Sequence, residues 1–226
     1  MRVLLGLSLT VALALTLVAA EPPIPIDLLA GTDLSGWKVV AKDAKADVSK
    51  TWTLKNGVLI CTGKPTSYVS TVAEYENYIL KLKWRYAPTD LKRPNSGVLI
   101  HVQKDDAFWP HSYEAQLALG QAGDLWLQYD VKKQLPILTM DPNRKDAANK
   151  EGRHFFRIGK DDAIEKAVGE WNDYEITANG DALLLKVNGV KVNDATACSL
   201  KKGRIALQAE GAEIHFKEMT LTPLPR

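Results

Sequence analysis

The segment 78–86 constrains the fold class more firmly than any other part of the chain. Apolar side chains occupy every even position, and Lys81, Lys83 and Arg85 occupy every odd position except that of Ile79. This two-residue period is typical of a β-strand with one buried face, and a helix, with about 3.6 residues per turn, would not produce it. The segment therefore predicts a long strand that packs its even side chains into a core.

A second strand signal is the dipeptide Asn188-Gly189, which separates two short apolar runs. Both residue types tolerate positive φ, so the dipeptide predicts a tight β-hairpin. Other alternating or apolar runs, punctuated by turn residues, occur at 52–61, 97–102, 112–119, 172–178, 203–209 and 213–221. Many short strands of this kind predict an all-β antiparallel sandwich or barrel.

One interval, residues 129–170, breaks the strand pattern. It is polar and rich in charge, and Asp141-Pro142 is a plausible helix start because proline favours the first helical position. We expect an insertion with one or two short helices here, and not a second domain.

The first 20 residues predict an export signal. Arg2 precedes an uncharged, mostly apolar run, and Val18 and Ala20 supply the small residues that a signal peptidase requires. A retained transmembrane helix needs about 20 apolar residues, but Glu21 and two prolines follow at once and no basic stop-transfer cluster appears. We therefore expect cleavage after Ala20, a single domain over 21–226, a periplasmic or extracellular location, and no membrane attachment after cleavage.

Charge and cysteine content exclude several classes of function. The chain has 29 Lys and Arg against 27 Asp and Glu, and so small a surplus does not favour binding to nucleic acid or to an anionic membrane. Two cysteines cannot form a disulfide scaffold or a four-thiolate zinc site. Cys61 and Cys198 could form one disulfide outside the cytoplasm, or each could be a small buried apolar residue.

Motifs for the commonest metal and serine chemistries are also missing from the sequence. The four histidines show no His-Glu-x-x-His spacing, and no Gly-x-Ser-x-Gly motif occurs. Nothing indicates a cofactor. A divalent cation bound by loop carboxylates such as Asp105, Asp106 or Asp124 stays open, although loop aspartates more often form turns.

Strand periodicity predicts which polar side chains share a face. In 112–119 the apolar set leaves Glu114 and Gln116 on the opposite face, and in 205–210 it leaves Gln208 and Glu210 there. In 97–103, Val98, Ile100 and Val102 would face the core and His101 the other side.

Amides beside carboxylates offer the donors and acceptors that sugar hydroxyls need, and Trp109 and Trp126 lie in neighbouring segments where they could stack on a sugar ring. Solvated outer faces of strands are the alternative interpretation. Trp37, Trp52 and Trp84 are expected in the core.

A series of motifs resembles one known family along nearly the whole predicted mature chain. The motifs, in order, are 28–37 (LLAGTDLSGW), Trp52 with 56–59 (NGVL), 95–98 (NSGV), 113–116 (YEAQ), 169–172 (GEWN), 187–189 (VNG) and 203–208 (GRIALQ) followed by 214–216 (IHF). Together they are similar to the 3-keto-disaccharide hydrolase domain. This resemblance implies a concanavalin-like jelly roll of two curved antiparallel sheets, exported by bacteria, with a carbohydrate site on the concave face.

The resemblance also implies a chemistry. A ketone at sugar carbon 3 acidifies the proton on carbon 2, so that base-assisted elimination followed by hydration cleaves the glycosidic bond. In this hypothesis Glu114 is the general base or acid, and Gln116, His101 and Asn95 position the substrate or stabilise negative charge. Gln208 and Glu210 would bind hydroxyls. The alternatives are a non-catalytic carbohydrate-binding module and a structural sandwich without a sugar site.

The same strand argues against ordinary double-displacement hydrolysis. Jelly-roll glucanases place two carboxylates on one strand as Glu-x-Asp-x-x-Glu, about 5–5.5 Å apart, whereas here Gln116 and Leu119 follow Glu114. Many members of the family that the chain resembles carry an Asp soon after this strand and an Arg after Asn-Ser-Gly, where this chain has Leu119-Gly120 and His101. Asp124 is the acid that could take the first of these places.

Overall fold

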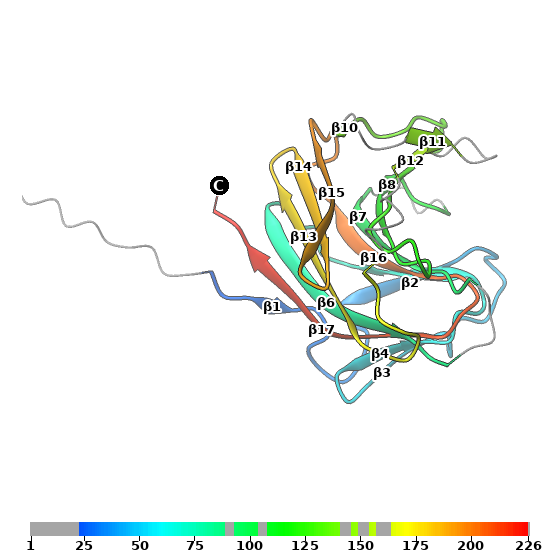
Figure 1. Ribbon diagram of the computed structural model, residues 1–226. Helices are drawn as coiled ribbons and strands as arrows, with labels where there is room; N and C mark the ends of the chain where they lie inside the picture. The colour runs from blue at the N-terminus through cyan, green and yellow to red at the C-terminus, as the bar shows by residue number, and fades with distance from the viewer. Residues whose placement is uncertain are drawn as a thin grey trace, which may run out of the picture.

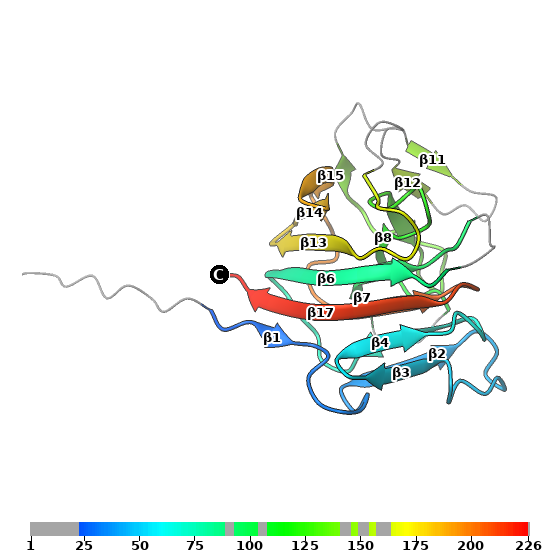
Figure 2. The same ribbon diagram turned by 60° about the horizontal axis from the view of Figure 1, so that its bottom comes forward.

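In the computed structural model the described residues are 23–88, 93–103, 108–140, 146–148, 154–156 and 164–225, and they form seventeen strands in two antiparallel sheets (Figure 1). The nine-stranded sheet consists, in spatial order, of β10 (Thr139–Met140), β15 (Val190–Thr196), β14 (Ala182–Val187), β13 (Asn172–Asn179), β6 (Tyr78–Tyr86), β17 (Ile214–Pro223), β4 (Val58–Cys61) and β3 (Trp52–Lys55), with β1 (Ile26–Asp27) paired to β17. Figure 2 shows β13, β6, β17, β4 and β3 side by side.

The eight-stranded sheet consists, in spatial order, of β11 (Asp146–Ala148), β12 (His154–Phe156), β9 (Leu125–Gln128), β8 (Ser112–Gln116), β7 (Gly97–Val102), β16 (Arg204–Ala209), β5 (Ser67–Thr71) and β2 (Trp37–Ala41). Together the two sheets confirm the predicted all-β sandwich.

The predicted signal segment 1–20 lies outside the described residues. Across the described ranges, no helix combines the length and apolar character needed to cross a bilayer.

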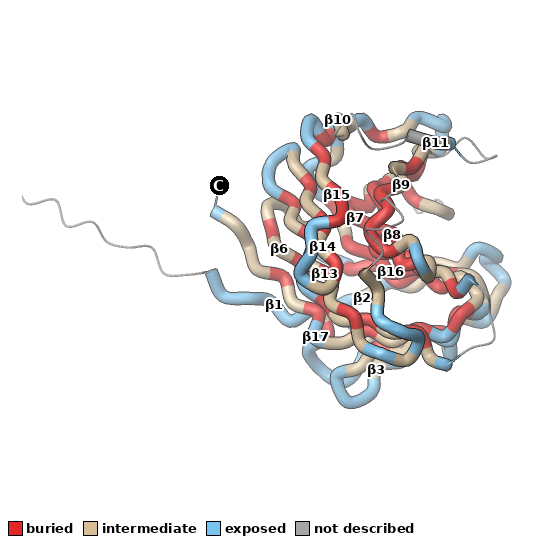
Figure 3. Tube along the Cα trace, viewed as in Figure 1, coloured by how far each residue is buried: buried red, intermediate tan, exposed pale blue. Residues whose placement is uncertain are grey.

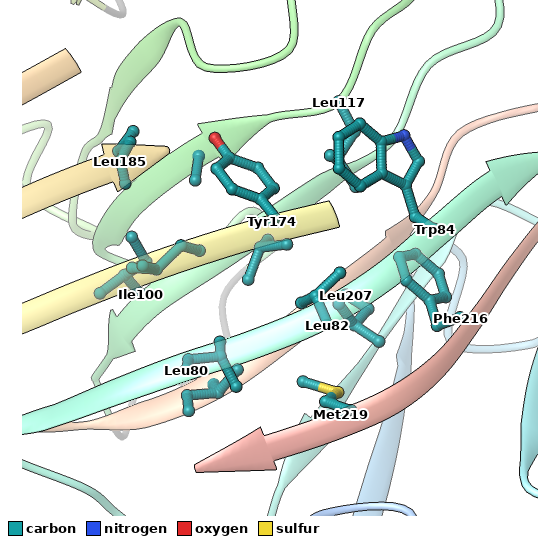
Figure 4. Packing of buried hydrophobic residues seen from close by; sticks show 14 of the residues in the cluster. Leu80, Leu82, Trp84, Ile100, Leu117, Tyr174, Leu185, Leu207, Phe216 and Met219 are labelled. Carbon is teal, nitrogen blue, oxygen red and sulfur yellow. The ribbon is translucent and has the colours of Figure 1, made fainter. Parts of the chain in front are cut away.

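The core lies between the two sheets and follows the predicted alternation of β6. All even positions from Tyr78 to Tyr86 are 3% exposed or less, and Figure 3 shows this burial along the strands where the sheets face each other. Close packing across the layer is visible in Figure 4, which includes Leu80, Leu82, Trp84, Phe216 and Met219 on one side and Ile100, Leu117 and Leu207 on the other. Each such side chain, when fully buried, stabilises the fold by about 1.5–3 kcal/mol.

The predicted hairpin is confirmed. Asn188 and Gly189 have φ of 49° and 83° and join β14 to β15. The pair of positive φ values matches the right-handed twist of the flanking strands. Asn56 and Gly57 have the same arrangement between β3 and β4.

The expectation of helices in 129–170 is wrong for the residues that the structure describes. Those residues contain three short strands instead: β10 extends one sheet by pairing with β15, and β12 and β11 extend the other beyond β9. Asp141 and Pro142, the proposed helix start, lie outside the described residues. The interval therefore lengthens both sheets at one edge of the sandwich.

The predicted orientation of His101 is wrong because β7 contains a bulge. Val102 pairs with Arg204 and Leu99 with Ala206, so β7 has one residue more than β16 over this stretch. His101 has a φ of 54° and turns its ring to the inner side, where it packs edge-on against Tyr78 of the other sheet. Val102 consequently joins Leu99 on the outer face, while Val98 and Ile100 face the core as predicted.

The two cysteines, for which pairing was open, are both free and buried. Desolvation raises the pKa of Cys61 to about 12 and that of Cys198 to about 11. Thiols with so little thiolate are weak nucleophiles, so both side chains act as small apolar core residues.

The buried ring of His101 makes stability depend on pH. Its Nδ1 lies 2.8 Å from the carbonyl oxygen of Leu200, and desolvation lowers its pKa below the ordinary 6.5. The unfolded chain therefore binds a proton at acidic pH that the folded chain excludes, and stability present above pH 6.5 is lost as the pH falls. Urea unfolding from pH 8 to 5 should show a decline that is shallower in His101→Asn, because asparagine tolerates positive φ. Parallel profiles for the two proteins would show that His101 is not the titrating group.

Candidate functional site

The outer face of the eight-stranded sheet, the face turned away from the other sheet, is itself largely covered. A second apolar cluster lies on it, made of Tyr68, Leu99, Val102 and Ala206 with Val40, Phe108 and Trp109 packed against them. Consequently every residue of β5, β7 and β8 is buried, including polar residues. Polar groups on this face are shielded from water, and their mutual interactions are stronger than on an open surface.

One row of side chains crosses the outer face at Glu114. In the sheet register Glu114 lies between Leu99 of β7 and Trp126 of β9, and Trp126 lies next to Phe155 of β12. The rings of Trp126 and Phe155 stack, with centroids 4.2 Å apart and planes inclined by 22°. Phe155 thus supports the indole on one side, and the Glu114 side of the row is left for a ligand.

The next row along the strands has a gap at Gly97, which begins β7. A Cβ atom at this position would lie 2.5 Å from Oε1 of Glu114 and 2.6 Å from Oε1 of Gln208. The carboxylate from β8 and the amide from β16 therefore converge over the glycine from its two sides. Any larger residue at position 97 would occupy the space that these two groups share.

The carboxyl group of Glu114 is buried and also fixed by a hydrogen bond. Glu114 is only 2% exposed, and the Nε2 group of Gln128 on β9 donates a hydrogen bond to its Oε2 atom. Oε1 of Gln208 has no hydrogen-bond partner among the described residues. Because two acceptor oxygens converge on one space, a ligand that brings a donor such as a hydroxyl fits between them.

The side-chain amide of Gln116, two residues further along β8, is held in one orientation. Its Oε1 accepts hydrogen bonds from the backbone N–H groups of Leu117 and Ala118, at 2.8 and 2.9 Å. These bonds fix the side chain, and the NH₂ end remains as the part that can donate to a ligand.

A second polar pair borders the glycine gap. The Nδ2 group of Asn95, just before β7, donates to Oε2 of Glu210, just after β16. Between these positions, the Ser96 hydroxyl donates to the carbonyl oxygen of Gln208 at 2.7 Å. The two segments are thereby fixed to each other, and Asn95 and Glu210 are set at one edge of the site.

These groups surround a pocket of about 250 Å³. The residues that line it are Arg93, Asn95, Glu114, Gln116, Ala118, Gln121, Trp126, Gln208 and Glu210. The structure thus brings together six residues that the sequence analysis named as candidates: Glu114, Gln116, Asn95, Gln208, Glu210 and Trp126.

Three other predicted residues do not line the pocket. His101 is on the inner side of its strand because of the bulge. Trp109 packs against Tyr68 in the second apolar cluster, with ring centroids 6.4 Å apart. Asp124 is only 1% exposed and its backbone pairs with Gln116 and Gln121. These three side chains are therefore not positioned to contact a ligand in the pocket.

Sequence reasoning missed several residues in or beside the pocket. Arg93 and Gln121 lie in connections outside the alternating runs, where periodicity carries no information, although Arg93 is only two residues before Asn95. Gln128 shows a weak signal, since it lies two residues after Trp126 and therefore shares its face. Gly97 appears in the sequence analysis only within the motif 95–98, because a glycine has no side chain whose polarity could mark the face on which it lies.

Within the described ranges, no group of three or more His, Cys, Asp or Glu side chains is arranged to hold a metal ion. Asp105 and Asp106, two candidates for a cation site, lie outside the described residues.

Comparison with solved structures identifies the fold. A candidate glycosyl hydrolase from Parabacteroides distasonis ATCC 8503 is 20% identical with a TM-score of 0.59, covering 89% of this chain and 94% of that one. The β-glucanase of Bacillus licheniformis is 10% identical with a TM-score of 0.56, covering 92% and 100%. The carbohydrate-binding module CBM66 of Bacillus subtilis is 12% identical with a TM-score of 0.57, covering 83% and 95%. The fold is therefore the expected concanavalin A-like jelly roll.

Sequence comparison gives a more specific result. No curated protein sequence matches the chain. A family match, however, extends over residues 25–222, from β1 to the end region of β17. That span includes both sheets except for the last residue of β17, and it includes every residue that lines the pocket. The chain therefore belongs to the family of the 3-keto-alpha-glucoside-1,2-lyase-like domain.

Proposed function

We propose that the protein cleaves 3-keto-α-glucosides by elimination across carbons 1 and 2 of the oxidised ring, with Glu114 as the base. The observation that carries this proposal is the convergence of the Glu114 carboxylate and the Gln208 amide over Gly97. The family to which the chain belongs is named for the same chemistry. The pocket, at about 250 Å³, is smaller than the roughly 300–1,000 Å³ of sites for drug-sized ligands, and this size favours one sugar ring.

The reaction needs one base and a stabilised oxyanion. The carboxylate takes the proton from carbon 2, and the electron pair of that C–H bond forms an enolate with the ketone of carbon 3. When the enolate returns its electrons, a double bond forms between carbons 1 and 2 and the bond from carbon 1 to the leaving oxygen breaks. The leaving oxygen then takes up a proton. Addition of water across the new double bond would give the 3-keto sugar.

Most of the polar residues in and beside the pocket have a role in this scheme. Gln128 holds the Glu114 carboxylate in place, and the NH₂ group of Gln116 and the guanidinium of Arg93 are donors suited to an enolate oxygen. Gln208 and the Asn95–Glu210 pair offer acceptors and donors to hydroxyl groups. The indole of Trp126, supported by Phe155, provides an apolar wall for the C–H groups of the ring.

The α configuration suits the proposed base. In an α-glucoside chair the hydrogen on carbon 2 and the oxygen on carbon 1 are both axial and point to opposite faces of the ring. A base on one face can therefore remove the proton while the leaving group departs from the other. Glu114, whose carboxylate lies over Gly97, would meet the first face.

We also propose that the protein works outside the cytoplasm. The support is the sequence of residues 1–20, whose single positive charge, apolar run and small residues are typical of an export signal.

Replacing the base should stop turnover without unfolding the protein. General-base catalysis contributes about 10²- to 10⁴-fold, so Glu114→Gln should lower kcat/KM for methyl 3-keto-α-glucoside by about 100-fold or more. Glu170→Gln, at an exposed carboxyl outside the pocket, should match wild type. The rate can be followed by release of methanol, and circular dichroism checks the fold.

The outcomes separate the possible functions. Near wild-type turnover by folded Glu114→Gln would refute the assignment of the base. Saturable binding of glucosides by the wild-type protein with no turnover would identify a carbohydrate-binding module instead of an enzyme.

Filling the gap at Gly97 should have a similar effect by another route. Gly97→Ala places a methyl group in the space shared by Glu114 and Gln208, and because the clash is with side-chain ends the fold should persist. We expect kcat/KM to fall at least about tenfold with little change in melting temperature, since a displaced catalytic group costs this much or more. The matched control is Gly36→Ala, where the added atom meets nothing within 4 Å. Unchanged kinetics in Gly97→Ala would contradict the proposed geometry.

A further inference from the structure

A second hollow begins where the pocket ends. It has a volume of about 450 Å³ and is lined by Lys42, Lys64, Pro65, Thr66, Glu210 and Gly211. Glu210 lines both spaces. A ligand that fills the pocket and extends past Glu210 therefore enters this hollow.

Backbone hydrogen bonds hold the walls of the hollow together. Lys42 directly follows β2, and its N–H donates to the carbonyl oxygen of Thr66, just before β5, at 3.0 Å. On the other side, the N–H of Gly211 donates to the carbonyl oxygen of Gly63 at 2.8 Å. The three segments that form the hollow are thus connected to one another and to the sheet that carries the pocket.

The charge of the hollow is positive. Lys42 and Lys64 contribute two ammonium groups, and within the described part of the chain neither forms an ion pair. Glu210 is the one acid in the lining, and its carboxylate accepts a hydrogen bond from Asn95 at the boundary with the pocket. The two lysines therefore leave a surplus of positive charge for a ligand in the hollow.

We propose that this hollow binds the leaving group of the substrate and favours leaving groups that carry an anion, such as a carboxylate, sulfate or phosphate. The proposal rests on the function proposed above. The base acts from beside Gly97, and a leaving group that extends out of the pocket past Glu210, which lines both spaces, would enter the hollow. The hollow beyond Glu210 is large enough for a further ring.

The expected preference is modest because both lysines are exposed. Exposed ion pairs contribute little free energy. Dissolved salt also limits the range of their attraction, to about 10 Å at 0.1 M ionic strength and less at higher salt. At low ionic strength we expect the protein to bind an anionic leaving group about three to ten times more tightly than a neutral one of the same shape, and we expect 0.5 M salt to remove most of the difference.

The test compares two glucosides that differ only in charge, with the full-length protein. The probes are 4-carboxyphenyl α-glucoside and its neutral match 4-carbamoylphenyl α-glucoside. Neither has a ketone, so affinity is measured by calorimetry without turnover. Their 3-keto forms then give kcat/KM, and the ratio of the two values should show the same preference.

Variants assign the preference to the two lysines. Lys42→Gln combined with Lys64→Gln should bring the ratio of affinities to about one and leave binding of the neutral glucoside unchanged. Lys42→Arg with Lys64→Arg should keep the preference, since the charge is retained. Lys55→Gln with Lys201→Gln, at exposed lysines outside the hollow, lowers the net charge equally and should also keep it.

Failure of this proposal can be distinguished from failure of the proposed function. Turnover of both 3-keto substrates with equal kcat/KM and equal affinities would overturn the leaving-group site while the elimination reaction stands. A charge preference in binding that the glutamine variants remove, without turnover of either 3-keto substrate, would support the hollow and refute the reaction. Binding of neither glucoside, or a preference that persists in the glutamine variants, would overturn the inference.

Discussion

The burial of one carboxylate is the constraint on which the rest of the site depends. Taking a charged group out of water is costly unless hydrogen bonds replace its hydration, and Glu114 is almost fully buried between a stacked aromatic pair and an apolar cluster. Gln128 supplies a donor from the neighbouring strand, and Gly97 leaves the space in which the other oxygen meets Gln208. Regular cross-strand register places all of these groups, so the site depends on the sheet being formed correctly.

The part of the site that could be predicted from sequence is the part carried by regular strands. Two-residue alternation placed Glu114 with Gln116 and Gln208 with Glu210, and it succeeded because β8 and the pocket end of β16 keep a regular register with their neighbours. It failed at His101 because one extra residue in β7 reverses the alternation. Histidine carries no signal for a bulge, whereas glycine at such a position would have given one.

Other differences arise where local sequence does not determine structure. The polar interval 129–170 was expected to contain helices, but its described short strands form because β15 and β9 offer free edges, which local composition does not reveal. Trp109 is a residue type that can stack on a sugar ring, but in this structure its indole packs against Tyr68. Arg93 reaches the pocket from a connection whose path depends on the packing of the whole sandwich.

The fold alone would suggest a different chemistry from the one that the residues favour. Double displacement on a jelly roll needs two carboxylates on one strand, and Glu114 is followed by an amide and an apolar residue at the corresponding positions. One base beside donors suited to an oxyanion is sufficient for elimination. The most direct test uses methyl 3-keto-α-glucoside with deuterium on carbon 2, corrected for exchange without protein. If a base removes that hydrogen, deuterium is lost to the solvent as methanol is released; a sugar product that keeps its deuterium would contradict the account.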